Sequence, residues 1–289
     1  MDRKGTKKSF LQSFGKRHLS FASILKMFMI PGNIFSMILK PSKVSARDVL
    51  GYYAQPGVLQ HYTEATERVG LWKSEKIIFK RVFPDKNVKL LELGCGTGRI
   101  SFGLHKAGYH RLTASDFSKK MVQGAKVLSQ KLKQEVEFQK QDATDLGYDS
   151  SSFDGVIFGF NGMMQIPGLP NRRKAIAESF RVLAPGGYFI FTAHDRTLPK
   201  WKKFWATERK KWNQGEQDPG LQEFGDRFEE TAKGKLFIHV PDVSELRSHL
   251  QAAGFVVERD VLRSKLAEED SLTQKYSDEC RFWVCRKPA

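Results

Sequence analysis

The segment from 88 to 99, Val-Lys-Leu-Leu-Glu-Leu-Gly-Cys-Gly-Thr-Gly-Arg, sets the architecture of this chain. Leu90, Leu91 and Leu93 form an apolar run of strand length, and glycines occupy positions 94, 96 and 98 directly after it. Apolar residues at helical spacing follow, so the segment predicts a strand, a tight loop and a helix. In open α/β sheets, ligands bind at the carboxyl ends of the strands, which is where such a loop lies.

The spacing of the glycines indicates which kind of ligand the loop binds. Dinucleotide-binding loops prefer G-x-G-x-x-G, and mononucleotide-binding loops end in Gly-Lys-Ser/Thr; neither pattern occurs here. The loop is instead preceded by Glu92, whose carboxylate repels a pyrophosphate and partly balances the charge of a cationic ligand.

The segment from Glu92 to Gly98 resembles the first motif of the class I S-adenosylmethionine (SAM)-dependent methyltransferases. Strand-like segments that end near Asp116, Asp142 and Phe160 resemble the next motifs of that family, and the resemblance runs from about residue 53 to residue 286. It implies that the cofactor is SAM. It also implies an α/β fold, doubly wound, with a mostly parallel seven-stranded sheet of order 3-2-1-4-5-7-6, in which strand 7 is antiparallel.

The resemblance implies roles for single residues. Asp116 would accept hydrogen bonds from the ribose hydroxyls, Phe117 would lie against adenine, and Asp142 would reach the adenine amino group, although Asp145 is close enough in sequence to take that place. Carbonyl groups after the fourth strand would hold the methionine amine. The predicted cofactor-binding residues are Glu92, Gly94, Cys95, Gly96, Gly98, Asp116, Phe117, Met121, Asp142, Ala143, Phe160 and Asn161.

The charge of the chain is concentrated at its beginning. The net charge is +16, and residues 1–43 hold nine basic residues against one acidic residue, which is half of that excess. The apolar stretch of residues 19–39 is interrupted by Lys26 and by Pro31-Gly32, so it is too short to span a membrane. We therefore predict that residues 1–43 form a basic amphipathic arm, which either lies on an anionic membrane surface or packs as a lid on the catalytic domain.

The remaining residues, 44–289, are predicted to form one methyltransferase domain that begins with helices. Tyr53 and Tyr62 on those helices are candidates to touch the cofactor or its neighbour. The three cysteines form no paired framework, which fits a reducing compartment. The sequence thus favours a cytoplasmic protein, either free or peripheral to the inner face of the membrane.

An insertion at about 196–238 departs from the family pattern. Trp201, Phe204, Trp205 and Trp212 share one helical face there, and aromatic walls suit a flat or lipid-like ligand. The insertion is predicted to form a cap over the acceptor pocket, although the tryptophans could equally serve only to pack that cap. The predicted pocket residues are Tyr62, Trp205, Trp212 and His239.

Methyl transfer from a sulfonium depends mainly on holding donor and acceptor in line, so a base is needed only for an acceptor whose proton has a high pKa. His194, directly after the fifth predicted strand, is the candidate base, with a turn-stabilising hydrogen bond as the alternative. Asp195 could orient its ring or cap a helix. No metal site is predicted.

The residues after the fourth strand, Phe160-Asn-Gly-Met163, lack the Asp/Asn-Pro-Pro-Tyr/Phe motif of enzymes that methylate amino groups of bases. The sequence therefore predicts a methyltransferase acting on a small-molecule or lipid-like acceptor, with nucleic acid a less favoured partner. Two alternatives remain at this point: an RNA or protein methyltransferase that uses the basic surface, and a membrane-associated SAM-binding protein without turnover.

Overall fold

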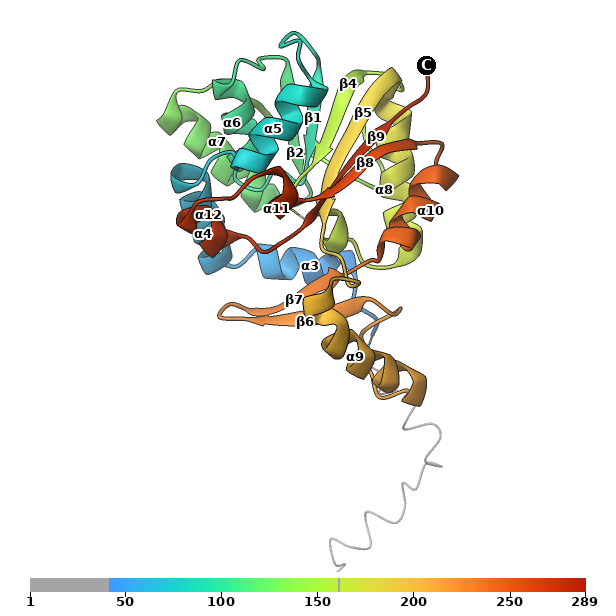
Figure 1. The fold of residues 1–289 in the computed structure, drawn as a ribbon. Helices are drawn as coiled ribbons and strands as arrows, with labels where there is room; N and C mark the ends of the chain where they lie inside the picture. Colours follow the sequence, from blue (N-terminus) through green and yellow to red (C-terminus); the bar gives the residue numbers. More distant parts are fainter. Residues whose placement is uncertain (1–41, 161) are drawn as a thin grey trace, which may run out of the picture. The chain divides into compact units, whose positions relative to one another are not determined.

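A seven-stranded sheet forms the centre of the domain of residues 42–289 (Figure 1). The structure is a computed structural model that describes residues 42–160 and 162–289, so most of the predicted arm and Asn161 lie outside the described residues. The strands are β1 Leu90–Leu93, β2 Leu112–Asp116, β3 Glu137–Lys140, β4 Phe153–Phe158, β5 Leu183–Ala193, β8 Val256–Leu262 and β9 Arg281–Arg286.

The order of the strands is β3-β2-β1-β4-β5-β9-β8, which confirms the predicted order and the antiparallel last strand. β1 pairs in parallel with β2 and β4, so Glu92 lies opposite Ala114 and Ile157. Because these neighbours run in the same direction, their carboxyl ends meet at one edge of the sheet.

Helices cover both faces of the sheet, as expected where apolar side chains project from each side of a buried parallel strand. Those on one face are α5 Lys73–Val82, α6 Arg99–Lys106 and α7 Lys119–Leu132; those on the other are α8 Leu169–Val182 and α10 Val243–Ala252. Leu90 packs with the α5 and α6 side chains, whereas its neighbour Leu91 packs with those of α8 and α10.

Two further helices come before α5, and two short ones join β8 to β9. They are α3 Ala46–Tyr53, α4 Pro56–Arg68, α11 Arg263–Leu266 and α12 Ser271–Tyr276. The backbone N–H of Val44 donates to the carbonyl of Gly220 at 2.9 Å, and the Tyr52 hydroxyl lies 3.2 Å from that of Thr231. These contacts fasten α3 to the insertion.

The insertion after β5 contains the predicted helix and a hairpin that the sequence analysis did not anticipate. Its elements are the 3-10 helix η3 Pro199–Trp201, α9 Lys202–Gln214, β6 Asp226–Thr231 and β7 Gly234–His239. β6 and β7 pair only with each other, in a second, two-stranded sheet. Among the described residues, no helix is both long and apolar enough to cross a membrane.

Candidate active site

A cavity of about 300 Å³ opens at the carboxyl ends of β1, β2 and β4, beside the glycine loop. Eight of the twelve predicted cofactor-binding residues line it: Gly94, Gly96, Asp116, Phe117, Met121, Asp142, Ala143 and Phe160. The register of the parallel strands explains this convergence, because the residues come from loops that leave adjacent strands at the same edge.

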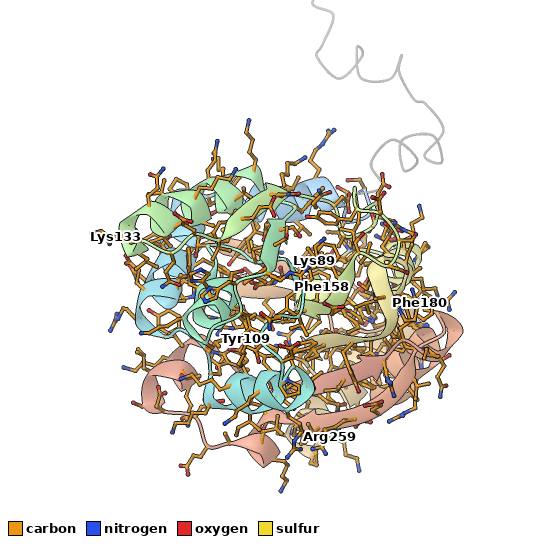
Figure 2. The ribbon with its side chains drawn as sticks, turned by 90° about the horizontal axis from the view of Figure 1, so that it is seen from above. Lys89, Tyr109, Lys133, Phe158, Phe180 and Arg259 are labelled. Carbon is orange, nitrogen blue, oxygen red and sulfur yellow. The ribbon has the colours of Figure 1, made fainter. Side chains whose placement is uncertain are left out.

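The glycine loop leaves room that side chains would fill. Gly94 and Gly96 have φ values of 63° and 55°, which L-residues with side chains rarely adopt. A Cβ on Gly94 would lie 2.8 Å from the Phe158 ring, and one on Gly96 would lie 3.2 Å from the Tyr62 ring. Phe158 is buried in the interior of the domain, whereas Lys133, labelled in the same view, lies at the periphery (Figure 2). Glycine is thus required at both positions by the neighbouring rings, and the main chain of both residues lines the cavity.

Asp116 is the last residue of β2. Its side chain holds the glycine loop and also lines the cavity. Its carboxylate accepts hydrogen bonds from the backbone N–H groups of Gly96 at 2.9 Å and Ser118 at 2.7 Å. Burial raises the pKa of Asp116 to about 6 although these two hydrogen bonds lower it. Each carboxylate oxygen has a second lone pair, so the side chain is suited to accept from a pair of vicinal hydroxyls such as those of a ribose.

Asp142 follows β3 and lines the same cavity, whereas Asp145 does not line it. The Oδ1 atom of Asp142 accepts from the N–H and the hydroxyl of Thr144, both at 2.8 Å. Within the described part of the chain its Oδ2 atom has no hydrogen-bond partner. Of the two acids that the sequence left as alternatives, Asp142 is therefore the one placed to meet an amino group.

A second, smaller cavity of about 40 Å³ adjoins the loop on its other side. Glu92 and Cys95 line it, together with Arg99, which pairs with Glu75 at 2.7 Å. Burial raises the pKa of Glu92 to about 7, and the hydrogen bond from the Ser101 hydroxyl acts in the opposite direction. The Arg99 guanidinium already donates to Glu75 and to the Gly70 carbonyl, so the Glu92 carboxyl is the group in this cavity that suits the amine of an amino acid moiety. The two cavities together thus fit SAM, the cofactor implied by the sequence.

Gly98 lines neither cavity. It is the residue before α6, with φ 96°, and a Cβ there would lie 2.8 Å from the Phe102 ring. Its left-handed conformation lets the chain turn into α6, and its contact with the cofactor stays a prediction that the lining of the two cavities does not support.

Phe160 is one of three non-glycine residues with a positive φ among the described residues, at 48°. Such a backbone conformation is strained for a bulky side chain and often occurs at functional sites. Its ring lies 6.1 Å from that of Tyr62 and 5.7 Å from that of Trp72, and it lines both cavities. Asn161, its predicted partner, lies outside the described residues.

The predicted aromatic wall of the acceptor pocket lies elsewhere, except for Tyr62. Trp205 is 7% exposed and packs between Phe204 and Phe224, with ring centroids 5.1 and 5.6 Å away. Trp212 packs against the cluster that contains Val44. Neither tryptophan lines the large cavity. Trp205 belongs to the core cluster that also contains Ile238 and Leu246, so this part of the stripe packs the insertion onto the domain.

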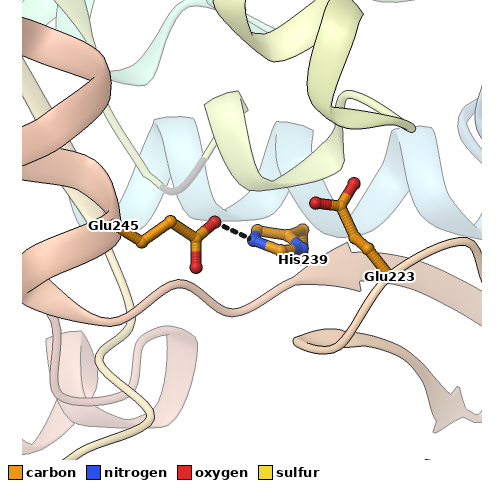
Figure 3. Close-up of side chains that lie close together, drawn as sticks. All are labelled: Glu223, His239 and Glu245. Atoms are coloured by element: carbon orange, nitrogen blue, oxygen red, sulfur yellow. Dashed lines mark hydrogen bonds and ion pairs between the residues drawn. The ribbon is translucent and has the colours of Figure 1, made fainter.

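His239 also does not line the large cavity but occupies a buried ion-pair network (Figure 3). Its Nδ1 atom lies 2.8 Å from Asp226 Oδ1 and its Nε2 atom 2.7 Å from Glu245 Oε1. Arg196 pairs with Glu245 at 2.7 Å. Burial lowers the pKa of His239, but the two carboxylate hydrogen bonds outweigh it and the net shift is upward. The network joins the hairpin to α10.

The group Glu223, His239 and Glu245 has the residue types of a metal site. However, Arg172 pairs with Glu223 at 2.7 Å, and both ring nitrogens of His239 already contact carboxylates. Arginines supply the positive charge that a metal ion would supply, so we interpret the group as an ion-pair network.

His194 does not line either cavity, so the structure does not place the candidate base beside the cofactor residues. Its Nδ1 atom lies 2.9 Å from the carbonyl oxygen of Glu279. Asp195 accepts from the hydroxyl and the N–H of Thr197 and pairs with Arg281 at 3.0 Å, which ties the turn to β9. The ring thus contacts the segment before β9 rather than the turn itself, so its contact is structural but differs from the hydrogen bond within the turn that was the alternative.

Several lining residues escaped the sequence analysis. Leu50 comes from α3, while Gln165 and Ile166 come from η2 Gly162–Gln165 and the turn after it. Among the α3 residues, only Tyr53 was a candidate in the sequence analysis, because it is an aromatic residue in the helices before the first motif. The others have no chemical signature in the sequence, because packing of α3 over the sheet edge brings them to the site.

Comparison with known proteins agrees with the fold. Residues 90–187 match the family model described as a methyltransferase domain. A demethylmenaquinone methyltransferase of Leptospira interrogans (strain Fiocruz L1-130) is 40% identical over 108 residues, which are 36% of this chain and 42% of the relative. The ubiquinone/menaquinone biosynthesis C-methyltransferase of Rickettsia felis is 34% identical over 127 residues, 42% of this chain and 48% of the relative. The chain thus matches less than half the length of either relative.

The fold is also that of solved methyltransferases. A SAM-dependent methyltransferase from Methanosarcina mazei superposes with a TM-score of 0.59 at 20% identity, over 73% of this chain and 97% of the other. Three observations indicate the same kind of protein. They are the strand order, the glycine loop preceded by Glu92, and the match to a methyltransferase domain. Residues 90–187 thus match a methyltransferase domain, the described chain has the fold of a class I SAM-dependent methyltransferase, and the cofactor that this domain and fold imply is SAM.

Proposed function

We propose that this protein transfers the methyl group of SAM to a small-molecule acceptor bound in the cavity beside the glycine loop. The observation that carries the proposal is the lining of that cavity, which combines Gly94, Gly96, Asp116 and Asp142 on one side with apolar and aromatic residues on the other. A mostly apolar pocket with a few convergent polar groups is typical of small-molecule sites.

SAM supplies an activated methyl group when it is bound. The described residues that line the cavity include no histidine, lysine, arginine or cysteine, and Asp116 and Asp142 are its only carboxylates. In this proposal both acids bind the cofactor, so this chain contributes positioning rather than a base. Holding two reactants in line lowers the barrier by up to about 7 to 11 kcal/mol.

The relatives support a small acceptor. Their names refer to menaquinone and ubiquinone biosynthesis, and quinones combine a flat ring with a lipid-like tail. On this basis we extend the proposal to flat or lipid-like acceptors. A peripheral location at an anionic membrane, reached through the basic residues 1–43, would give such an acceptor direct access.

Calorimetric titration of the full-length protein with SAM and with S-adenosylhomocysteine tests the cofactor part. We expect binding of both, at least about tenfold weaker in Asp142→Ala, because the hydrogen bond to the adenine amino group is lost. Asp149→Ala is the matched control, since Asp149 is exposed and lies outside the cavity. Absence of binding to either compound would refute the proposed function.

If the cofactor binds, release of S-adenosylhomocysteine in the presence of a panel of acceptors tests turnover. Release with quinol-type small molecules but not with RNA or protein substrates is the expected result. Cofactor binding without release on any acceptor would favour the alternative of a SAM-binding protein that does not turn over.

A further inference from the structure

The lining of the large cavity divides by element. The glycine loop and the ends of β2 and β3 supply one half, which holds the predicted cofactor residues. The other half comes from α3 and from the segment that follows β4. Its apolar lining residues are Ala46, Val49, Leu50, Ile166 and Pro167. We call this second half the α3 half.

The α3 half offers no charge to a ligand. Its lining residues include no aspartate, glutamate, lysine, arginine or histidine among the residues that the structure describes. Its ionisable groups are the phenols of Tyr53 and of Tyr62 at its border, and burial raises the pKa of both, that of Tyr62 to about 12. Both hydroxyls are therefore neutral at physiological pH. A charged ligand group buried here would have no partner, which is strongly unfavourable.

The α3 half does offer hydrogen bonds at one place. The Tyr53 hydroxyl donates to the side-chain oxygen of Gln165, and the Tyr62 hydroxyl lies 3.4 Å from that of Tyr53. Hydroxyl and amide groups can both donate and accept hydrogen bonds. Tyr53, Tyr62 and Gln165 can therefore donate to a ligand carbonyl oxygen or accept from a ligand hydroxyl.

The position of Tyr53 is fixed from outside the cavity. Its ring packs edge-on against Tyr52 and Tyr62, with centroids 5.4 and 5.8 Å away. Tyr52 in turn contacts Thr231 of the hairpin through its hydroxyl, at 3.2 Å. The insertion thus acts on the cavity indirectly, by holding α3, although its own tryptophans do not line the cavity.

We propose that the α3 half binds an uncharged, mainly apolar acceptor that carries a hydroxyl or carbonyl oxygen, and that Tyr53 and Gln165 recognise this oxygen. This inference rests on the proposed function and adds the chemical class of the acceptor and the residues that select it. Tyr53 and Gln165 are specificity residues in this scheme.

Three probes of similar shape test the proposal on the full-length protein saturated with S-adenosylhomocysteine. They are 2-naphthol, which is neutral and has a hydroxyl, 2-methylnaphthalene, which lacks the hydroxyl, and 2-naphthoate, which is charged. Their affinities are measured at pH 7 by fluorescence titration. We expect 2-naphthol to bind tightest, about fivefold more tightly than 2-methylnaphthalene, as for one net hydrogen bond, and 2-naphthoate to bind weakest.

Tyr53→Phe keeps the ring and removes the hydroxyl, so it should remove the preference for 2-naphthol while leaving the affinity for 2-methylnaphthalene unchanged. Gln165→Leu should have the same effect through the other partner. Tyr188→Phe is the matched control, because Tyr188 lies on β5 outside the cavity and its change should alter neither affinity.

Equal or tighter binding of 2-naphthoate, no binding of the neutral probes, or an unchanged preference in both Tyr53→Phe and Gln165→Leu would overturn this inference. The calorimetric titration separates that failure from a failure of the proposed function. If S-adenosylhomocysteine binds and the probe pattern fails, only the acceptor class is wrong. If S-adenosylhomocysteine does not bind, the proposed function itself is wrong.

Discussion

Replacing His239 with phenylalanine should make the domain unfold far more easily, because it removes the centre of the buried network between the hairpin and α10. His239 is 1% exposed, and its ring lies between the carboxylates of Asp226 and Glu245 at 2.8 and 2.7 Å. The substitution leaves the buried Asp226 carboxylate without its cationic partner. Removal of one partner of a buried pair costs about 3 to 5 kcal/mol of unfolding free energy. For a domain of this size that corresponds to a lower Tm by about 6 to 20 °C.

The same network predicts how stability depends on pH. The pKa of His239 is raised in the folded state, so its contribution is complete below the ordinary histidine pKa of 6.5 and is lost as the pH rises through the folded value. The pKa of Glu245 is lowered to about 2 from 4.5, so its contribution is complete above pH 4.5 and is lost as the pH falls toward 2. The network therefore stabilises the domain most between about pH 4.5 and 6.5.

Urea denaturation at pH 6 and pH 9, followed by tryptophan fluorescence, measures both effects. The difference in unfolding free energy between the native protein and His239→Phe should be larger at pH 6. Lys235→Ala is the control on the same hairpin, since Lys235 pairs with Glu230 at 3.5 Å with both side chains exposed. We expect it to change the unfolding free energy by less than about 1 kcal/mol. A His239→Phe loss no larger than that of Lys235→Ala, or the same loss at both pH values, would refute this account.

Three further outcomes are expected. Gly94→Ala should abolish calorimetric binding of SAM, because its Cβ would lie 2.8 Å from Phe158 at a φ of 63°; unchanged affinity would show that the loop conformation does not matter for binding. Trp205→Ala should lower the unfolding free energy by about 3 to 5 kcal/mol yet leave the affinity for S-adenosylhomocysteine unchanged. A weakened affinity without loss of stability would instead indicate that Trp205 contributes to the binding site. Replacing Lys16 and Arg17 with glutamine in the full-length protein should weaken sedimentation with anionic vesicles by about 2 kcal/mol in binding free energy, and equal sedimentation would contradict the membrane role of the arm.

The site was predicted best where its residues come from the ends of the strands. Gly94 could be identified from its position directly after an apolar run, and Asp116 and Asp142 from the resemblance of the segments before them to strands of the family, since the ends of parallel strands meet at one edge of the sheet. The choice between Asp142 and Asp145 needed the structure, since the two equally polar side chains lie in one short loop and their directions depend on the turn.

The acceptor half of the cavity was predicted poorly for a different reason. Trp205 and His239 have the chemistry of pocket residues, but Trp205 packs into the main apolar core and His239 pairs with Asp226 of the hairpin and Glu245 of α10. The chemical type of a side chain indicates which contacts it can make, and the residues that the fold places beside it decide which contacts it does make.

The strand and helix segments and the glycine loop could be predicted from the amino-acid sequence, because they follow from hydrophobic periodicity and glycine spacing, which act over a few residues. The strand order was implied by the resemblance of these segments to the methyltransferase family, and the structure confirms it. The folded structure was needed to show that α3 covers the site and that Tyr53 meets Gln165, 112 residues away. Such a contact depends on how α3 is held by the insertion, through Val44 and Tyr52, and no local pattern encodes the meeting of three segments so far apart in the chain.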